Sequence, residues 1–290
     1  MSAFKSILVP VGDAQTATQP LDAALGLASR LGSHVTGLHV RVDPTTAVPL
    51  VGEGMSGAMV EEMISIAETQ GAQRAQAARK LFDEACARHG APLASAPGAA
   101  GLSAEWLDLT GREDDVVAWR GRLSDLIVFA HTGTDADVPA MMTLNSALMA
   151  TGRPLLLCPA EGGAGFGHSI AIAWNGSVEA SRAVAAALPL LIKAESVTIL
   201  AVTEHAEKTI EAPADELAAY LAWNGVTAKI SLAQATTAHA GEELLRQAGK
   251  AGADLLVMGA YTHSRLRQLI LGGVTRHVIA HAPMAVLMCH

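Results

Sequence analysis

The chain has 290 residues, with 20 Lys and Arg against 28 Asp and Glu, so its net charge is −8 with neutral histidines. This acidic balance argues against general nucleic-acid binding, which needs a basic face. Half of the residues are hydrophobic, but they occur in short runs that never reach the ~18–20 consecutive apolar residues of a membrane span. The first residues lack the charged region and cleavage site of a signal peptide.

The chain contains three cysteines, Cys86, Cys158 and Cys289, and none of them lies in a CxxC motif or at zinc-finger spacing. Three cysteines cannot build a disulfide framework. A reducing cytoplasm is therefore the expected location.

Short β-type runs alternate with Ala-rich helical segments along the whole chain. In the first half, the pattern predicts strands over 6–12, 34–42, 104–109, 124–130 and 154–159, and helices over 17–31, 58–89, 113–121 and 138–151. In the second half, it predicts strands over 169–174, 196–203, 227–233, 254–259 and 284–289, and helices over 178–193, 213–224, 240–251 and 264–281. Continuously apolar strands indicate sheets covered on both faces.

Three apolar runs recur in the same order and indicate a tandem duplication. Residues 6–12 match 169–176, residues 124–130 match 253–259, and residues 154–159 match 284–289. A Gly-rich stretch over 161–167 has linker composition. We therefore predict two α/β domains, 1–160 (the first half) and 168–290 (the second half), each a Rossmann-like, doubly wound parallel sheet of five strands with helices on both faces.

The second half carries the residues that suggest a ligand. The turn Trp174-Asn175-Gly176-Ser177 follows its first strand, Met258-Gly259 ends its fourth, and Gly272-Gly273 opens a helix. Glycines at a helix start let backbone N–H groups approach an anion. Residues 255–290 contain no Asp or Glu but do contain Arg265, Arg267 and Arg276, which favours a phosphate. The alternative is that Gly272-Gly273 is only a tight loop into a packed helix.

On these residues the chain resembles the universal stress protein family, over both halves. The family carries a Gly-x2-Gly-x9-Gly-Ser/Thr spacing after strand four, which Gly259, Thr262, Gly272 and Gly273 follow in position, with Thr262 replacing the second glycine and Gly273 the Ser/Thr. Asn175 replaces the aspartate that the family carries after strand one.

The resemblance implies an adenine nucleotide alpha hydrolase-like fold. It also implies that the strand-one turn and the end of strand two hold adenine and ribose, and that the glycine loop holds phosphates. The implied nucleotide-binding residues are Trp174, Asn175, Val202, Met258, Gly259, Thr262, Gly272, Gly273, Val274 and Thr275.

The first half departs further from this pattern. Asp13 is displaced by one position, and Thr143-Leu144 stand where the phosphate glycine and the Ser/Thr are expected. Both residues carry side chains, so a phosphate cannot approach their backbone N–H groups as closely as it can at glycine. We therefore predict a degenerate first half with a structural role.

Three functions remain open. The leading one, implied by the resemblance, is a non-enzymatic cytoplasmic stress protein that binds ATP or AMP, with or without Mg²⁺, and has no catalytic residues and no metal site. The second is a slow nucleotide-phosphate hydrolase or transferase, which would need a metal-holding acid near the phosphates. The third is a protein-interaction module that no longer binds nucleotide.

Two interfaces are expected, one between the halves of the chain and one between two copies of it. The fifth strands, 154–159 and 284–289, are apolar, and the resemblance implies that the halves pair through them about a pseudo-twofold axis as an intramolecular pseudo-dimer. Helix 58–89 has no counterpart of its length in the second half and offers a surface for a homodimer.

Overall fold

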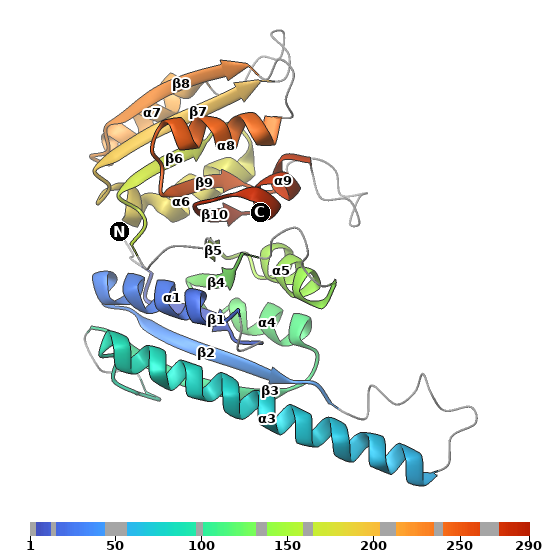
Figure 1. Cartoon of the computed structure of the whole chain (residues 1–290). Coiled ribbons are helices and arrows are strands. Elements are labelled where there is room, and N and C mark those ends of the chain that lie inside the picture. The colour runs from blue at the N-terminus through green and yellow to red at the C-terminus, as the bar shows by residue number, and fades with distance from the viewer. Residues whose placement is uncertain are drawn as a thin grey trace.

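The computed structural model describes residues 4–12, 16–43, 57–96, 101–131, 138–158, 165–203, 213–234, 240–261 and 273–290. These residues form a single ten-stranded sheet that runs through the molecule and is flanked by helices (Figure 1). The strand order is β3-β2-β1-β4-β5-β10-β9-β6-β7-β8. Each half contributes five neighbouring strands, and the predicted α/β fold class is confirmed.

The first half supplies five strands and four described helices. They are β1 (Ser6–Pro10), α1 (Thr18–Leu31), β2 (His34–Arg41), α3 (Gly57–His89), β3 (Ser103–Thr110), α4 (Glu113–Gly121), β4 (Leu126–Ala130), α5 (Val138–Ala150) and β5 (Leu155–Cys158). The second half repeats this alternation. Its elements are β6 (Ser169–Ala173), α6 (Val178–Leu191), β7 (Ser196–Thr203), α7 (Ala214–Trp223), β8 (Ala228–Gln234), α8 (Ala240–Lys250), β9 (Leu255–Gly259), α9 (Gly273–His281) and β10 (Ala285–Cys289).

The predicted elements agree with the structure apart from their ends. The strand predicted over 124–130 begins at Leu126, because Asp125 is engaged with the start of β1. Of the helix predicted over 264–281, residues 273–281 form α9, and residues 262–272 lie outside the described part of the chain. Among the described helices, none is both long and apolar enough to cross a membrane.

Two apolar cores sandwich the sheet. Helices α1, α3, α6 and α7 contribute to the core on one face, and α4, α5, α8 and α9 to the core on the other. The central strands are buried on both faces; β5 and β10 have no exposed position. This two-sided burial explains why the strands are continuously apolar rather than alternating.

The two halves meet at β5 and β10, which pair antiparallel, whereas the other strand pairs are parallel. Leu287 lies opposite Leu156 in this ladder, and both side chains are fully buried. An antiparallel ladder between equivalent strands is the arrangement that a twofold axis between the halves produces. The predicted pairing of the fifth strands is therefore confirmed.

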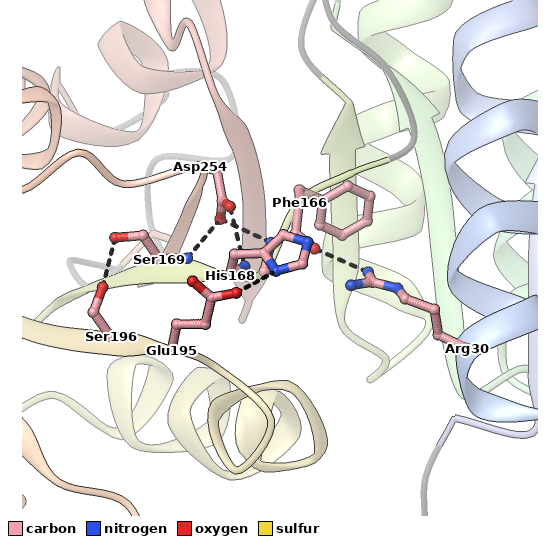
Figure 2. Close-up of polar contacts among 8 residues, drawn as sticks. Arg30, Phe166, His168, Ser169, Glu195, Ser196 and Asp254 are labelled. Atoms are coloured by element: carbon pink, nitrogen blue, oxygen red, sulfur yellow. Dashed lines mark hydrogen bonds and ion pairs between the residues drawn. The ribbon is translucent and has the colours of Figure 1, made fainter.

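The aspartates shared by the repeated runs 124–130 and 253–259 have one role in both halves. The Asp125 carboxylate accepts hydrogen bonds from the backbone N–H groups of Lys5 (2.8 Å) and Ser6 (3.0 Å) at the start of β1. The Asp254 carboxylate accepts from Gly167 (2.8 Å), His168 (3.0 Å) and Ser169 (3.3 Å) at the start of β6 (Figure 2). Both carboxylates thus fix the amino end of a central strand, opposite the expected ligand side.

The described end of the Gly-rich linker is anchored rather than loose. Phe166 is buried, its carbonyl oxygen accepts a hydrogen bond from Arg30 Nη2 at 2.9 Å, and the Arg30 guanidinium lies 5.6 Å from the centre of its ring (Figure 2). Arg30 belongs to α1 of the first half. The linker therefore forms a second contact between the halves, at the amino ends of the strands.

Candidate functional site

The second half has a topological switch point between β6 and β9. These strands are neighbours, with Ala173 opposite Met258. After β6 the chain enters α6, which packs on one face of the sheet, and after β9 it continues toward α9, which packs on the other. The chain thus diverges at the carboxyl ends of the two strands, where doubly wound folds bind their ligands.

The turn between β6 and α6 is fixed by its own side chains. Asn175 Oδ1 accepts a hydrogen bond from the Ser177 N–H at 3.1 Å, and Ser177 Oγ accepts from the Ala180 N–H at 3.1 Å as the N-cap of α6. Gly176 has a φ of 76°, which glycine adopts without strain. The exposed Asn175 therefore already uses its amide oxygen within the turn.

Gly259, at the end of β9, packs against the backbone of α6. A Cβ atom placed on Gly259 would lie 2.5 Å from the Ala180 nitrogen and 2.7 Å from the Glu179 carbonyl carbon. The first turn of α6 therefore approaches β9 as closely as glycine permits. In this chain the position needs glycine for helix–sheet packing, whatever its part in ligand binding.

The same contact brings an acidic residue, Glu179, close to the end of β9. Glu179 is a half-buried residue in the first turn of α6, and its Cβ lies 2.9 Å from the Cβ position built on Gly259. Sequence analysis missed it because it considered only acids near the glycine loop in the sequence, and residues 255–290 contain none. Glu179 comes from another element, α6, so the spacing around the glycine loop gives no signal for it.

Tyr261 follows β9 in a strained backbone conformation. Within the described part of the chain it is the non-glycine residue with a positive φ, 63°. Its hydroxyl donates to Asn145 Oδ1 at 2.6 Å, and its ring meets that of His290 edge-on, with centres 6.1 Å apart. Burial raises the pKa of Tyr261 to about 12, so the hydroxyl remains a donor at neutral pH.

The partner of Tyr261 comes from the first half. Asn145 lies in α5, so this hydrogen bond ties the chain after β9 to the other half of the molecule. The Tyr261 N–H also faces Thr275 Oγ1 of α9, at 3.4 Å. Nothing in the sequence pattern indicated this link, because Tyr261 and Asn145 are 116 residues apart.

The start of α9 is described from Gly273 onward. Gly273 is exposed, and a Cβ atom built on it meets no atom of the described residues within 4 Å. Thr275 is buried, and Val274 packs against the core on its face of the sheet. Thr262 and Gly272, together with Arg265 and Arg267, lie outside the described residues.

The remaining predicted residues lie at the strand ends but are largely covered. Trp174 is 9% exposed and belongs to the core under α6, and its backbone N–H donates to the Leu200 carbonyl oxygen at 2.8 Å. Met258 is 3% exposed, and Val202, at the end of β7, is half-buried against the same core as Met258. Trp174 and Met258 therefore present little side-chain surface to a ligand.

The equivalent region of the first half differs in shape and charge. Thr143 and Leu144 are buried inside α5, more than a turn beyond its start, so neither lies in a loop. The Glu113 carboxylate comes within 3.2 Å of the Cβ position built on Gly12, in the turn after β1. Asp13 lies outside the described residues.

Among the described side chains, no group of three or more His, Cys, Asp and Glu is arranged to hold a metal ion. His277 and His281, one helical turn apart, stack their rings with centres 4.4 Å apart. His281 Nδ1 lies 3.0 Å from the His277 carbonyl oxygen, so this nitrogen is engaged with the helix backbone.

The model of the universal stress protein family matches residues 168–290. By structure, the chain is similar to a universal stress protein from Archaeoglobus fulgidus, with 14% identity, 97% of both chains covered and a TM-score of 0.67. It is also similar to a protein of unknown function from Pseudomonas aeruginosa, with 15% identity, 99% of this chain and 92% of that chain covered, and a TM-score of 0.58. No protein with a curated description matches the sequence.

At such identities the structural matches show the fold alone, and they show it over almost the whole chain. The chain therefore has the fold of a tandem repeat of two Rossmann-like halves. The predicted resemblance to the universal stress protein family is confirmed by the family model over residues 168–290.

Proposed function

We propose that the second half of the chain binds an adenine nucleotide, ATP or AMP, and that the protein acts by binding rather than by catalysis, in a cytoplasmic stress response. The observation that carries this proposal is the switch point between β6 and β9. The turn at Asn175 follows β6 at this switch point, and β9 begins the segment 255–290, which contains no acidic residue and includes the exposed Gly273 at the described start of α9. A helix start without acids attracts phosphate.

We further propose that residues 1–160 and 168–290 are the two domains, and that the first does not bind nucleotide. The burial of Thr143 and Leu144 inside α5 supports the proposal that the first half does not bind nucleotide. The first half then acts as a structural partner, which holds Tyr261 through Asn145. Isothermal titration of the chain with ATP should give about one site per chain.

Gly273→Asp is expected to weaken ATP binding at least about tenfold without loss of stability. An acidic residue in the first turn of a helix is favourable for folding, and the Cβ position is open among the described residues. A carboxylate placed where phosphate would approach repels it, and a loss of about 1.4 kcal/mol corresponds to a tenfold change. Titration calorimetry measures the affinity, and urea unfolding checks the fold.

Gly57→Asp is the matched control, because Gly57 is also exposed at the first position of a helix and its Cβ position is also open. This control should bind ATP as the parent does. Equal ATP affinity of Gly273→Asp and the parent would overturn the proposed phosphate position. Two equivalent sites per chain would overturn the proposed role of the first half.

The enzymatic alternative is favoured by one observation, the proximity of Glu179 to the end of β9. If Mg²⁺ accompanies the nucleotide, Glu179 is the described carboxylate that could help to hold it. We expect ATP turnover far below the ~1–100 s⁻¹ of kinases, with release of labelled phosphate unchanged in Glu179→Gln. Turnover in the kinase range that this substitution abolishes would establish an enzyme instead.

A further inference from the structure

Tyr261, in its strained backbone conformation, stands next to the proposed nucleotide site. Its φ of 63° lies in the left-handed region, which L-residues other than asparagine and aspartate rarely adopt. Such a conformation persists only where the surrounding structure holds it, and positions of this kind gather at functional sites. The contacts of Tyr261 come from other parts of the fold, and they explain how the conformation is held.

The side chain of Tyr261 is held at both its ring and its hydroxyl. The ring packs against the apolar core to which α5 and α9 contribute, and it meets the ring of His290 edge-on. The hydroxyl donates to Asn145 Oδ1 at 2.6 Å. Asn145 belongs to α5, so the direction of the Tyr261 side chain depends on a residue of the first half.

The backbone of Tyr261 adjoins two residues of the predicted nucleotide site. Gly259 precedes it by two positions, and the Tyr261 N–H faces Thr275 Oγ1, in the first turn of α9, at 3.4 Å. The intervening Ala260 donates its N–H to the Cys289 carbonyl oxygen at 2.8 Å, so β10 fixes the chain up to this point. A rotation of the Tyr261 backbone would therefore shift the chain relative to the start of α9, where we propose that phosphate binds.

The asparagine at position 145 is explained by this contact and not by helix formation. Asn145 lies inside α5, and asparagine forms helices less readily than the alanine, leucine and methionine that make up much of that helix. The pairing of β5 with β10 brings α5 toward the end of β9, within reach of Tyr261. An apolar residue at position 145 would leave the Tyr261 hydroxyl without this acceptor.

We propose that Asn145 is a positioning residue of the nucleotide site, supplied by the first half. Through Tyr261 it holds the backbone between Gly259 and the first turn of α9 in the conformation that receives a phosphate. This inference rests on the proposed function of the second half. It gives the first half, which carries no nucleotide of its own in that proposal, a part in the affinity for ATP. Because Asn145 acts on the phosphate side, it affects the binding of ATP and not that of adenosine.

The test is a double-mutant cycle of Asn145→Ala and Tyr261→Phe in the full chain, measured by titration with ATP and with adenosine. Each single variant is expected to bind ATP about fivefold more weakly than the parent, which corresponds to the net loss of one hydrogen bond. The double variant should bind ATP no more weakly than the single variants, because both substitutions remove the same bond. Adenosine, which has no phosphate, should bind every variant within about twofold of the parent, and circular dichroism checks that each variant is folded.

Tyr220→Phe and Asn224→Ala are the matched controls. They make the same two changes at α7, where Asn224 Nδ2 donates to the Tyr220 carbonyl oxygen at 3.0 Å, and both should bind ATP as the parent does. Unchanged ATP affinity in the Asn145 and Tyr261 variants, an equal loss for ATP and adenosine, or additive losses in the double variant would overturn this inference and leave the proposed nucleotide site standing. A parent that binds no ATP would instead overturn the proposed function, and this inference with it.

Discussion

Gly259→Ala is expected to destabilise the protein by about 3 kcal/mol or more, at the top of the usual range for an overpacked core. The added methyl group would lie 2.5 Å from the Ala180 nitrogen and 2.7 Å from the Glu179 carbonyl carbon. These are backbone atoms at the start of α6, so no side-chain rotation relieves the clash. Either α6 moves away from β9 or the strand shifts, and both disturb a fully buried core.

Urea unfolding measures this loss, and Gly273→Ala serves as its control. The added methyl group at Gly273 meets no described atom within 4 Å, so that variant should stay within about 0.5 kcal/mol of the parent. A Gly259→Ala protein as stable as the parent would show that α6 does not approach β9 this closely. The comparison also separates a glycine needed for packing from one left open for a ligand.

The sequence was sufficient to predict the order of elements, and the resemblance to the family implied their joining at the fifth strands. The order of elements depends on local signals, namely apolar runs such as 254–259 and Ala-rich segments between them, repeated once along the chain. The repeat also marked Asp125 and Asp254, but only the structure shows why an acid recurs there. Each carboxylate accepts backbone hydrogen bonds from the start of a neighbouring strand.

The parts of the site that sequence could not predict are those that depend on helix placement. Glu179 is near Gly259 because α6 packs against the end of β9, and the two residues are 80 positions apart in the chain. Asn145 meets Tyr261 because β5 and β10 join the halves and bring α5 toward the end of β9. Neither contact corresponds to a sequence motif, because the spacing of residues along the chain indicates only local structure.

Leu287→Ala is expected to destabilise both halves together, by about 2–5 kcal/mol, because it removes a fully buried side chain at the seam between them. Leu287 of β10 lies opposite Leu156 of β5, and both belong to the same apolar core. The pairing at the seam spans three residue pairs, and Phe166 docked on Arg30 supplies a further contact between the halves. We therefore expect the chain to unfold in a single cooperative transition.

Two tryptophans allow each half to be followed separately during urea unfolding. Trp106 packs against Phe82 in the first half, and Trp174 is buried in the core of the second. In backgrounds that retain only one of them, with the other tryptophans replaced by Phe, Leu287→Ala should move both transitions to lower urea by the same amount. Leu232 is 73% exposed and gives the control. Leu232→Ala should change the free energy of unfolding measured at either tryptophan by no more than about 0.5 kcal/mol. If the halves unfold as one cooperative unit, the loss of a core residue that they share lowers the stability reported by both tryptophans. A transition that shifts at Trp174 but not at Trp106 would therefore show that the halves unfold independently.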